Sequence, residues 1–262
     1  MTPPQIDQPT GNRPRSIWTR RFHQLGSPPF FYTLVGKLLP WVGTLCALCF
    51  AAGLYSGLIL APTDYQQGES YRIIYIHVPA AWMSMFVYLI LAISGGIGLI
   101  WRMKLAQIVA RASAPIGAAY TFLALLTGSL WGKPMWGTWW IWDARLTSEL
   151  VLLFLYLGYM ALQAAIDDRR TAARAGAVLA LVGVINLPII HFSVEWWSTL
   201  HQGPTVTKFD KPSIATSMLI PLLLMAIAFQ LHYLVALFAR VRAEILDSER
   251  RSAWVTKMVA AS

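Results

Sequence analysis

The sequence is poor in charged residues. Only 13% of its 262 residues are Asp, Glu, Lys or Arg, whereas 56% are hydrophobic, and the mean hydropathy is +0.53. A soluble globular domain usually carries about 25% charged residues. The scarcity of charge excludes an ordinary water-soluble enzyme and indicates a protein of the lipid bilayer.

Cysteine is almost absent as well. The two cysteines, Cys46 and Cys49, form a CxxC spacing inside an apolar run, and Phe50 follows them, so they do not make the CxxCH motif of covalent haem attachment. A redox-active pair needs access and electropositive surroundings, which an apolar run does not provide. We therefore predict that both cysteines are packing residues.

Six apolar stretches approach the length of about 20 residues that a helix needs to cross about 30 Å of hydrocarbon. They cover residues 40–60, 78–101, 112–130, 148–166, 175–191 and 214–239. No segment between them alternates with a period of two over strand lengths, so helices are the only plausible spanning elements. The sequence predicts an all-α integral membrane protein with six transmembrane helices in residues 38–240, an N-terminal arm in residues 1–37 and a C-terminal tail in residues 241–262.

Lysine and arginine are distributed unevenly among the segments between these stretches. If the N-terminus is cytoplasmic, sixteen of the 21 Lys and Arg residues fall inside and five outside, while the twelve acidic residues divide evenly. This excess predicts that both termini are cytoplasmic. The arm holds no apolar run followed by a cleavage site, so we expect an uncleaved first helix. The net charge of +9 is then a topology signal, and we expect no nucleic-acid partner.

Tryptophan is concentrated in WGKPMWGTWWIWD, between the third and fourth stretches. Seven of the twelve tryptophans lie in or beside the expected outer segments: Trp131, Trp136, Trp139, Trp140, Trp142, Trp196 and Trp197. An aromatic belt needs tryptophans spread around the perimeter, whereas Gly132, Pro134 and Gly137 are expected to break the helix and gather them. Such a group favours a platform for a planar apolar ligand, with the belt as the alternative.

Two of the five histidines flank this segment. His77, in YIHVPAAW, is expected just above a second helix that begins at Pro79. His201, in WWSTLHQGP, is expected on the same outer face. Two imidazoles beside a platform for a planar ligand predict the axial ligands of a haem iron. His23 and His232 are expected to be solvent-exposed or packing residues.

The outer segments also hold a few charged residues. Arg72 and Arg145 would suit haem propionates, with contact to lipid phosphate as an equal alternative. Asp143 is expected to cap the following helix or to orient Arg145, and Glu149 is expected to be structural.

Two prolines interrupt the outer halves of the last two stretches. Pro188 and Pro221 each free a backbone carbonyl, which is tolerated where helices line a cavity. We therefore expect an outward-opening cavity roofed by the tryptophan segment. His191 and Glu195 are expected to pair beside it, because they are four residues apart. A similar spacing of Asp247 and Arg251 suggests that the sixth helix continues past residue 240.

The motif WGTWWIWD, from Trp136 to Asp143, resembles the WWD signature of tryptophan-rich haem-handling proteins of cytochrome c biogenesis. Together with YRIIYIHVPAAW and NLPIIHFSVEWWSTLHQGPT, it resembles the haem exporter protein C (CcmC) branch over residues 40–240. The resemblance implies a six-helix protein of the bacterial inner membrane with haem at its periplasmic face. It implies that His77 and His201 are axial ligands, with a WWD segment over residues 131–147.

The resemblance also implies a ligand and partners. The ligand would be haem b, presented to the periplasmic haem chaperone CcmE. The WWD signature of the family falls on Trp136, Gly137, Trp140, Trp142 and Asp143. We expect the other outer tryptophans, Trp131, Trp139, Trp196 and Trp197, to complete the platform for haem and chaperone. Other implied partners are the small membrane protein CcmD and the ABC transporter subunits CcmA and CcmB, beside the lipid bilayer.

Two other classes of function remain open at this stage. A bis-histidine membrane cytochrome that reduces or oxidises quinone would also need two axial histidines, although these usually lie on helices within the bilayer. A transporter of haem or a small molecule would need polar groups along a central path, and the spans offer mainly Asn186. Neither a nucleophile nor an acid–base pair is evident, so we expect a positioning role rather than conventional enzyme catalysis.

Overall fold

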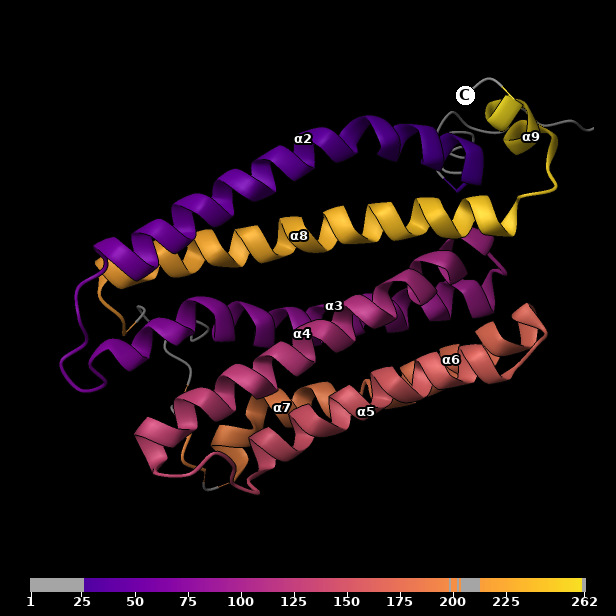
Figure 1. Cartoon of the computed structure of the whole chain (residues 1–262). Coiled ribbons are helices and arrows are strands. Elements are labelled where there is room, and N and C mark those ends of the chain that lie inside the picture. Colours follow the sequence, from indigo (N-terminus) through magenta and orange to yellow (C-terminus); the bar gives the residue numbers. More distant parts are fainter. Residues whose placement is uncertain (1–25, 198, 202, 204–212, 261–262) are drawn as a thin grey trace, which may run out of the picture.

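The structure, a computed structural model, describes residues 26–197, 199–201, 203 and 213–260 (Figure 1). In this part of the chain six helical segments are long and apolar enough to cross a membrane, and none of it forms a strand, which confirms the predicted fold class. The six segments are Pro28–Leu60, Glu69–Ile100, Lys104–Trp136, Ala144–Ala165, Arg169–Trp196 and Thr216–Ser248.

The first span begins earlier than expected. Helix α2 (Pro28–Tyr55) starts ten residues before the predicted boundary of the membrane domain at residue 38, so residues 28–37 of the predicted arm extend the first helix. Proline suits the first helical position, because its fixed φ is helical and its missing N–H would have no partner there. The rest of the arm, residues 1–25 with His23, lies outside the described residues.

The helices form two groups around a central pair. Helix α3 (Ile74–Ile100) packs along α4 (Lys104–Trp136), with α2 and α8 (Thr216–Ser248) on one side. Helices α5 (Ala144–Ala165), α6 (Arg169–Gly183) and α7 (Asn186–Trp196) pack on the other side (Figure 1). One cluster of buried apolar residues fills each side, so the central pair contributes to both.

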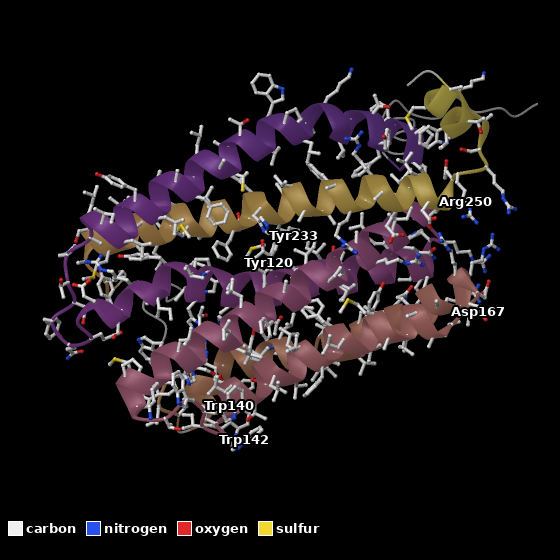
Figure 2. All side chains as sticks on the ribbon, in the orientation of Figure 1. Tyr120, Trp140, Trp142, Asp167, Tyr233 and Arg250 are labelled. Atoms are coloured by element: carbon white, nitrogen blue, oxygen red, sulfur yellow. The ribbon has the colours of Figure 1, made fainter. Side chains whose placement is uncertain are left out.

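Tyrosine hydroxyls join the helices across these clusters. Tyr156 on α5 donates to the carbonyl of Ser84 on α3 at 2.8 Å. On the other side Tyr120 of α4 donates to the carbonyl of Phe229 on α8 at 3.0 Å, and Tyr233 of α8 lies nearby (Figure 2). A buried hydroxyl left unpaired costs free energy, so these bonds fix the helices relative to one another.

The fifth span differs from the expected single helix. It is divided at residues 184–185 into α6 and α7, and Pro188 is the third residue of α7. The Val184 carbonyl, which Pro188 cannot satisfy, accepts the Leu187 N–H at 3.0 Å instead. The proline therefore forces a tighter turn here rather than an unpaired carbonyl.

The sixth span continues as predicted, but not for the predicted reason. Helix α8 ends at Ser248, before Arg251, and Asp247 forms an ion pair with Arg169 of α6 at 2.5 Å. A short helix α9 (Ala253–Ala260) follows.

The cysteines are free thiols, and buried Cys46 contacts the carbonyl of Ala228, in agreement with a packing role.

The bundle has two chemically different ends. We call the end formed by residues 61–68, 137–143 and 197–201 the tryptophan end, and the opposite end, formed by residues 101–103 and 166–168, the arginine end (Figure 1). The tryptophan end contains His77, His201 and the tryptophan segment. Residues 198, 202 and 204–212 lie outside the described residues.

Candidate functional site

His77 lies inside a helix rather than above it. A 3-10 helix, η2 (Glu69–Ile73), leads into α3 at Ile74, so His77 is the fourth residue of α3. Pro79 lies inside α3 and does not begin it. The proline removes only one helical hydrogen bond, the one to the Tyr75 carbonyl, so the apolar residues before Pro79 can still be helical.

The imidazole of His77 is fixed from α4. Its Nδ1 lies 3.0 Å from the Ala124 carbonyl oxygen and 3.0 Å from the Thr127 hydroxyl. A carbonyl only accepts, so Nδ1 carries the proton and Nε2 of the neutral ring keeps a free lone pair. Gly128 leaves room for the ring, since a Cβ there would lie 3.2 Å from Cε1 of His77.

His201 is fixed in the same way by the aspartate that closes the WWD motif. Its Nδ1 lies 2.8 Å from Oδ2 of Asp143. The other carboxylate oxygen of Asp143 accepts the Leu146 N–H at 2.8 Å and so caps α5. Capping was one of the two roles expected for Asp143. Thr199 donates to Asp143 and accepts the backbone N–H of His201 at 3.1 Å. A carboxylate only accepts, so Nδ1 of His201 carries the proton and Nε2 of the neutral ring is unprotonated.

The Asp143–His201 pair is well shielded from water, with side chains only 8% and 13% exposed. Burial raises the pKa of Asp143, but hydrogen bonds from Thr199, Leu146 and His201 outweigh burial and hold that pKa below its ordinary value. Burial and the Arg145 guanidinium lower the pKa of His201, and together they outweigh the Asp143 carboxylate, which raises it. The result is an ionised aspartate beside a neutral imidazole, the protonation state that metal ligation requires.

Both histidines line one cavity of about 90 Å³. Its other walls come from α3, α4, α5 and α7: Val78, Ala81, Trp82, Met85, Ala124, Leu125, Arg145, Leu146, Glu149 and Ile190. The expected cavity is therefore present, but its lining holds none of the seven outer tryptophans. Small-molecule sites usually measure about 300–1,000 Å³, so this cavity is too small to enclose a macrocycle.

The tryptophan segment is half helix and half loop. Helix α4 runs through Gly132 and Pro134 to Trp136, so the expected break occurs only at Gly137, which adopts φ 78° and caps α4. Gly132 instead allows close packing, because a Cβ there would lie 3.1 Å from the Trp136 ring. Trp136 in turn packs edge-on against His201 at 4.8 Å between ring centroids. This contact joins the segment to the histidine site.

The other outer tryptophans differ in exposure, because Trp131 and Trp140 are half-buried whereas the remaining four are exposed. Trp142 is 77% exposed and packs edge-on against Trp140 at 5.5 Å (Figure 2). Trp139 is 55% exposed, and the buried Nε1 of Trp140 has no hydrogen-bond partner. Trp196 and Trp197 are exposed at the end of α7. A group of large aromatic side chains that is open on one side can contact a flat ligand or a partner.

The two candidate arginines lie in different places. Arg145 lines the histidine cavity, together with the buried Glu149 one helical turn away on α5. Arg72 does not line that cavity. Its guanidinium donates to the carbonyls of Gly57 at 2.7 Å and Ala61 at 2.9 Å and pairs with Glu69. Arg72 thereby satisfies the carbonyls of the π-helix η1 (Ser56–Leu60) that ends the first span.

Two further histidines were considered from the sequence. His191 and Glu195 are both exposed and do not pair with each other, because His191 contacts the ring of Phe192 instead. His232 is a packing residue, as expected, with its Nδ1 2.7 Å from the Tyr120 hydroxyl.

Sequence reasoning missed two residues of the cavity. Trp82 is not among the seven outer tryptophans singled out from the sequence, yet it lines the histidine cavity. Glu149 was assigned a structural role, yet its buried Oε1 lacks a hydrogen-bond partner at this cavity. A carboxylate inside an apolar span was the signal that could have identified Glu149.

Comparisons with known proteins assign the family. The profile of the "Heme exporter protein C" family matches residues 21–256. The chain is 52% identical to Heme exporter protein C of Escherichia coli strain K12 over 243 residues, which are 93% of this chain and 98% of that protein. It is 55% identical to the Bradyrhizobium diazoefficiens protein of that name over 228 residues, 87% of this chain and 86% of that one.

A more distant relative shows similar coverage. Heme exporter protein C of Paracoccus denitrificans is 41% identical over 231 residues, which are 88% of this chain and 93% of that protein. Six apolar helices, a match over almost the whole chain and identities of this size agree with one another. The chain therefore belongs to the haem exporter protein C (CcmC) family, the multi-pass membrane proteins that handle haem in cytochrome c biogenesis.

Proposed function

We propose that the chain holds haem b at its tryptophan end, through Nε2 of His77 and Nε2 of His201, and delivers it to the haem chaperone CcmE. One observation carries this proposal: each histidine uses Nδ1 in a hydrogen bond to a carbonyl or carboxylate, and both line one cavity. Metal-ligating histidines almost always have their second nitrogen fixed in this way. In each neutral ring this leaves the Nε2 lone pair unprotonated, as a metal ligand requires.

The orientation and partners follow from the charge distribution and the family resemblance. The excess of Lys and Arg at the arginine end supports a cytoplasmic location for that end, so the tryptophan end faces the periplasm of the bacterial inner membrane. Partners consistent with this location are CcmE, the small membrane protein CcmD and the transporter subunits CcmA and CcmB. The membrane domain that carries the site runs from Pro28 to Ser248.

Haem cannot occupy the cavity as it stands, because about 90 Å³ has room only for a few water molecules. Loading therefore requires the segment that carries His201 to separate from α3. His201 is attached through Asp143 and Thr199, whereas His77 is built into two packed helices. We therefore assign the fixed ligand to His77 and the movable ligand to His201.

The surrounding residues would bind the rest of the haem. Arg145 lines the cavity and can pair with a propionate. Arg72, already engaged with two carbonyls and Glu69, holds the first loop in place and would reach a propionate only by leaving them. The exposed rings of Trp139 and Trp142 offer the face on which the macrocycle or the chaperone would pack.

Loading of the chaperone tests this function. The chain, CcmE and the other partners would be produced together in cells that lack their own copy of this gene, and covalent haem on CcmE would be measured by haem staining. We expect His77→Ala and His201→Ala to abolish loading, while His191→Ala, an exposed histidine of the same end, leaves loading unchanged. Normal loading in both ligand variants would refute the proposal.

A further inference from the structure

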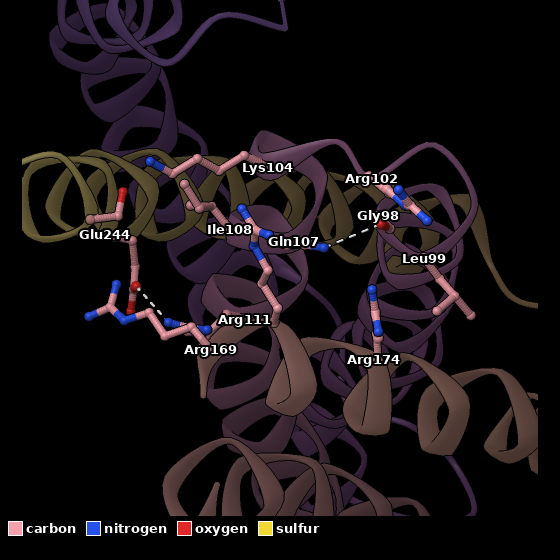
Figure 3. A pocket seen from close by; sticks show the side chains of 12 residues that line it. Gly98, Leu99, Arg102, Lys104, Gln107, Ile108, Arg111, Arg169, Arg174 and Glu244 are labelled. Carbon is pink, nitrogen blue, oxygen red and sulfur yellow. Dashed lines mark hydrogen bonds and ion pairs between the residues drawn. The ribbon is translucent and has the colours of Figure 1, made fainter. Parts of the chain in front are cut away.

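A large cavity lies at the arginine end, opposite the histidine site. It measures about 640 Å³ and is open to the surface (Figure 3). Six cationic side chains line it: Arg102, Lys104, Arg111, Arg169, Arg170 and Arg174. They come from the α3–α4 connection, from α4 and from the start of α6, so the fold and not the local sequence brings them together.

The cations of this cavity exceed the nearby carboxylates. Glu244 is the only acidic residue in the described lining, and it lies 3.6 Å from Arg111. Lys104 and Arg169 are paired with residues of the C-terminal region, Glu249 and Asp247.

Three other arginines, Arg102, Arg170 and Arg174, form no ion pair within the described residues. The buried Nε of Arg111 also has no hydrogen-bond partner in the part of the chain that the structure describes. The cavity therefore has unused donors and an uncompensated positive charge, which favours an anionic occupant.

One local feature of the cavity is strained. Arg102 adopts φ 55°, the left-handed conformation that glycine adopts at little cost and other residues adopt at a cost. Arg169 and Arg170 occupy the first turn of α6, where the carboxylate of the N-cap residue Asp168 accepts the Thr171 N–H and offsets part of their charge. The positive-inside rule accounts for arginines at this end, but not for a strained arginine that joins five other cations around one cavity.

The surface beside the cavity changes from charged to aliphatic. Arg170, Arg174, Val178 and Val182 are exposed and follow one another at intervals of four residues along α6. Each interval advances about 6 Å toward the middle of the membrane. Ile100 and Trp101, exposed at the end of α3, lie at the level expected of the membrane surface. A ligand here would meet arginines at one end and apolar side chains at the other.

We propose that this cavity binds the phosphate head group of an anionic phospholipid of the cytoplasmic leaflet, with Arg102, Arg170 and Arg174 as its main ligands. Basic pockets between transmembrane helices on that side suit anionic lipid head groups, and arginine pairs with phosphate through two parallel hydrogen bonds. The exposed Val178 and Val182 favour a lipid over free phosphate, because they would pack against its acyl chains. The inference does not depend on haem binding.

The test uses the full chain purified in a zwitterionic detergent. Short-chain phosphatidylglycerol, short-chain phosphatidylcholine and inorganic phosphate are titrated separately, and binding is followed by calorimetry. The variants are Arg170→Gln/Arg174→Gln and Arg102→Gly, which removes a charge where glycine relieves the backbone. The control is Lys37→Gln/Arg240→Gln, which removes the same charge from exposed positions outside the cavity lining.

We expect phosphatidylglycerol to bind and phosphatidylcholine not to bind. Each arginine removed should weaken the affinity for phosphatidylglycerol about fivefold, so the double variant should bind it about 25-fold more weakly than the parent. The affinity of the control variant should stay within about twofold of the parent. Equal weakening in the control would mean attraction to net charge alone and would overturn the proposal. Inorganic phosphate binding as tightly as the lipid would overturn the lipid as the occupant, and no binding of either would overturn the site.

Discussion

Replacing Asp143 by Asn should damage the haem site while leaving the fold almost intact. One carboxylate oxygen of Asp143 caps α5 through the Leu146 N–H, and the other accepts from His201. Asparagine caps helices as well as aspartate, so its amide oxygen can keep the first bond. Its amide nitrogen then faces Nδ1 of His201 and can only donate to it.

This reversal moves the proton of His201 to Nε2, the nitrogen proposed to bind iron. Loss of an outer-shell partner usually costs about 10- to 100-fold in metal affinity, which equals about 1.4–2.7 kcal/mol. The assay is a haem titration of the purified chain, followed by absorbance, with the unfolding temperature measured in parallel. We expect Asp143→Asn to weaken haem binding by at least tenfold with little change in unfolding.

Asp143→Ala is the matched control, because alanine removes both bonds. It should weaken haem binding similarly and also destabilise the protein by about 1 kcal/mol through the lost cap. If Asp143→Asn binds haem as tightly as the parent, the aspartate only caps α5, and the reasoning about the histidine tautomer is refuted.

Three other predictions concern the same site. Burial lowers the pKa of His201, so the ring stays neutral and haem binding should persist as the pH falls past about 6.5. Loss of haem binding at or above that pH in an absorbance titration would contradict the assignment of His201 as a ligand. Gly128→Ala should displace His77 by a few tenths of an ångström and weaken haem binding roughly three- to tenfold, and unchanged titration curves would mean that the ring position is unimportant. Trp142→Ala should reduce haem retention or chaperone capture in a pull-down, whereas Trp41→Ala, at an exposed tryptophan of α2, should not. Equal effects of the two changes would mean that the outer tryptophans only form an aromatic belt at the membrane surface.

Some features could be predicted from the sequence because they depend on local chemistry. Apolar length predicted the six spans, and the capping role of Asp143 followed from its place before a helix. The break between α6 and α7 was not predicted, because the effect of Pro188 depends on which N–H satisfies the Val184 carbonyl.

The rest of the site depends on long-range packing. Thr199 lies 56 residues from Asp143, and only the folded bundle brings the two together. The same holds for Trp82 and Glu149, which reach the histidine cavity because α3 and α5 pack against α4. The sequence alone did not distinguish Arg72 from Arg145. Arg72 donates to the carbonyl of Gly57, which is available because the first span ends as a π-helix, and the sequence did not predict that ending.

The most direct test of the central claim is the visible absorption spectrum of the purified chain, produced with haem supplied and compared with His77→Ala and His201→Ala. The account predicts a low-spin haem spectrum in the parent that is lost or changed in each variant, because each removes one axial nitrogen. Identical spectra in all three proteins, or a parent that binds no haem even with its partners present, would contradict the account.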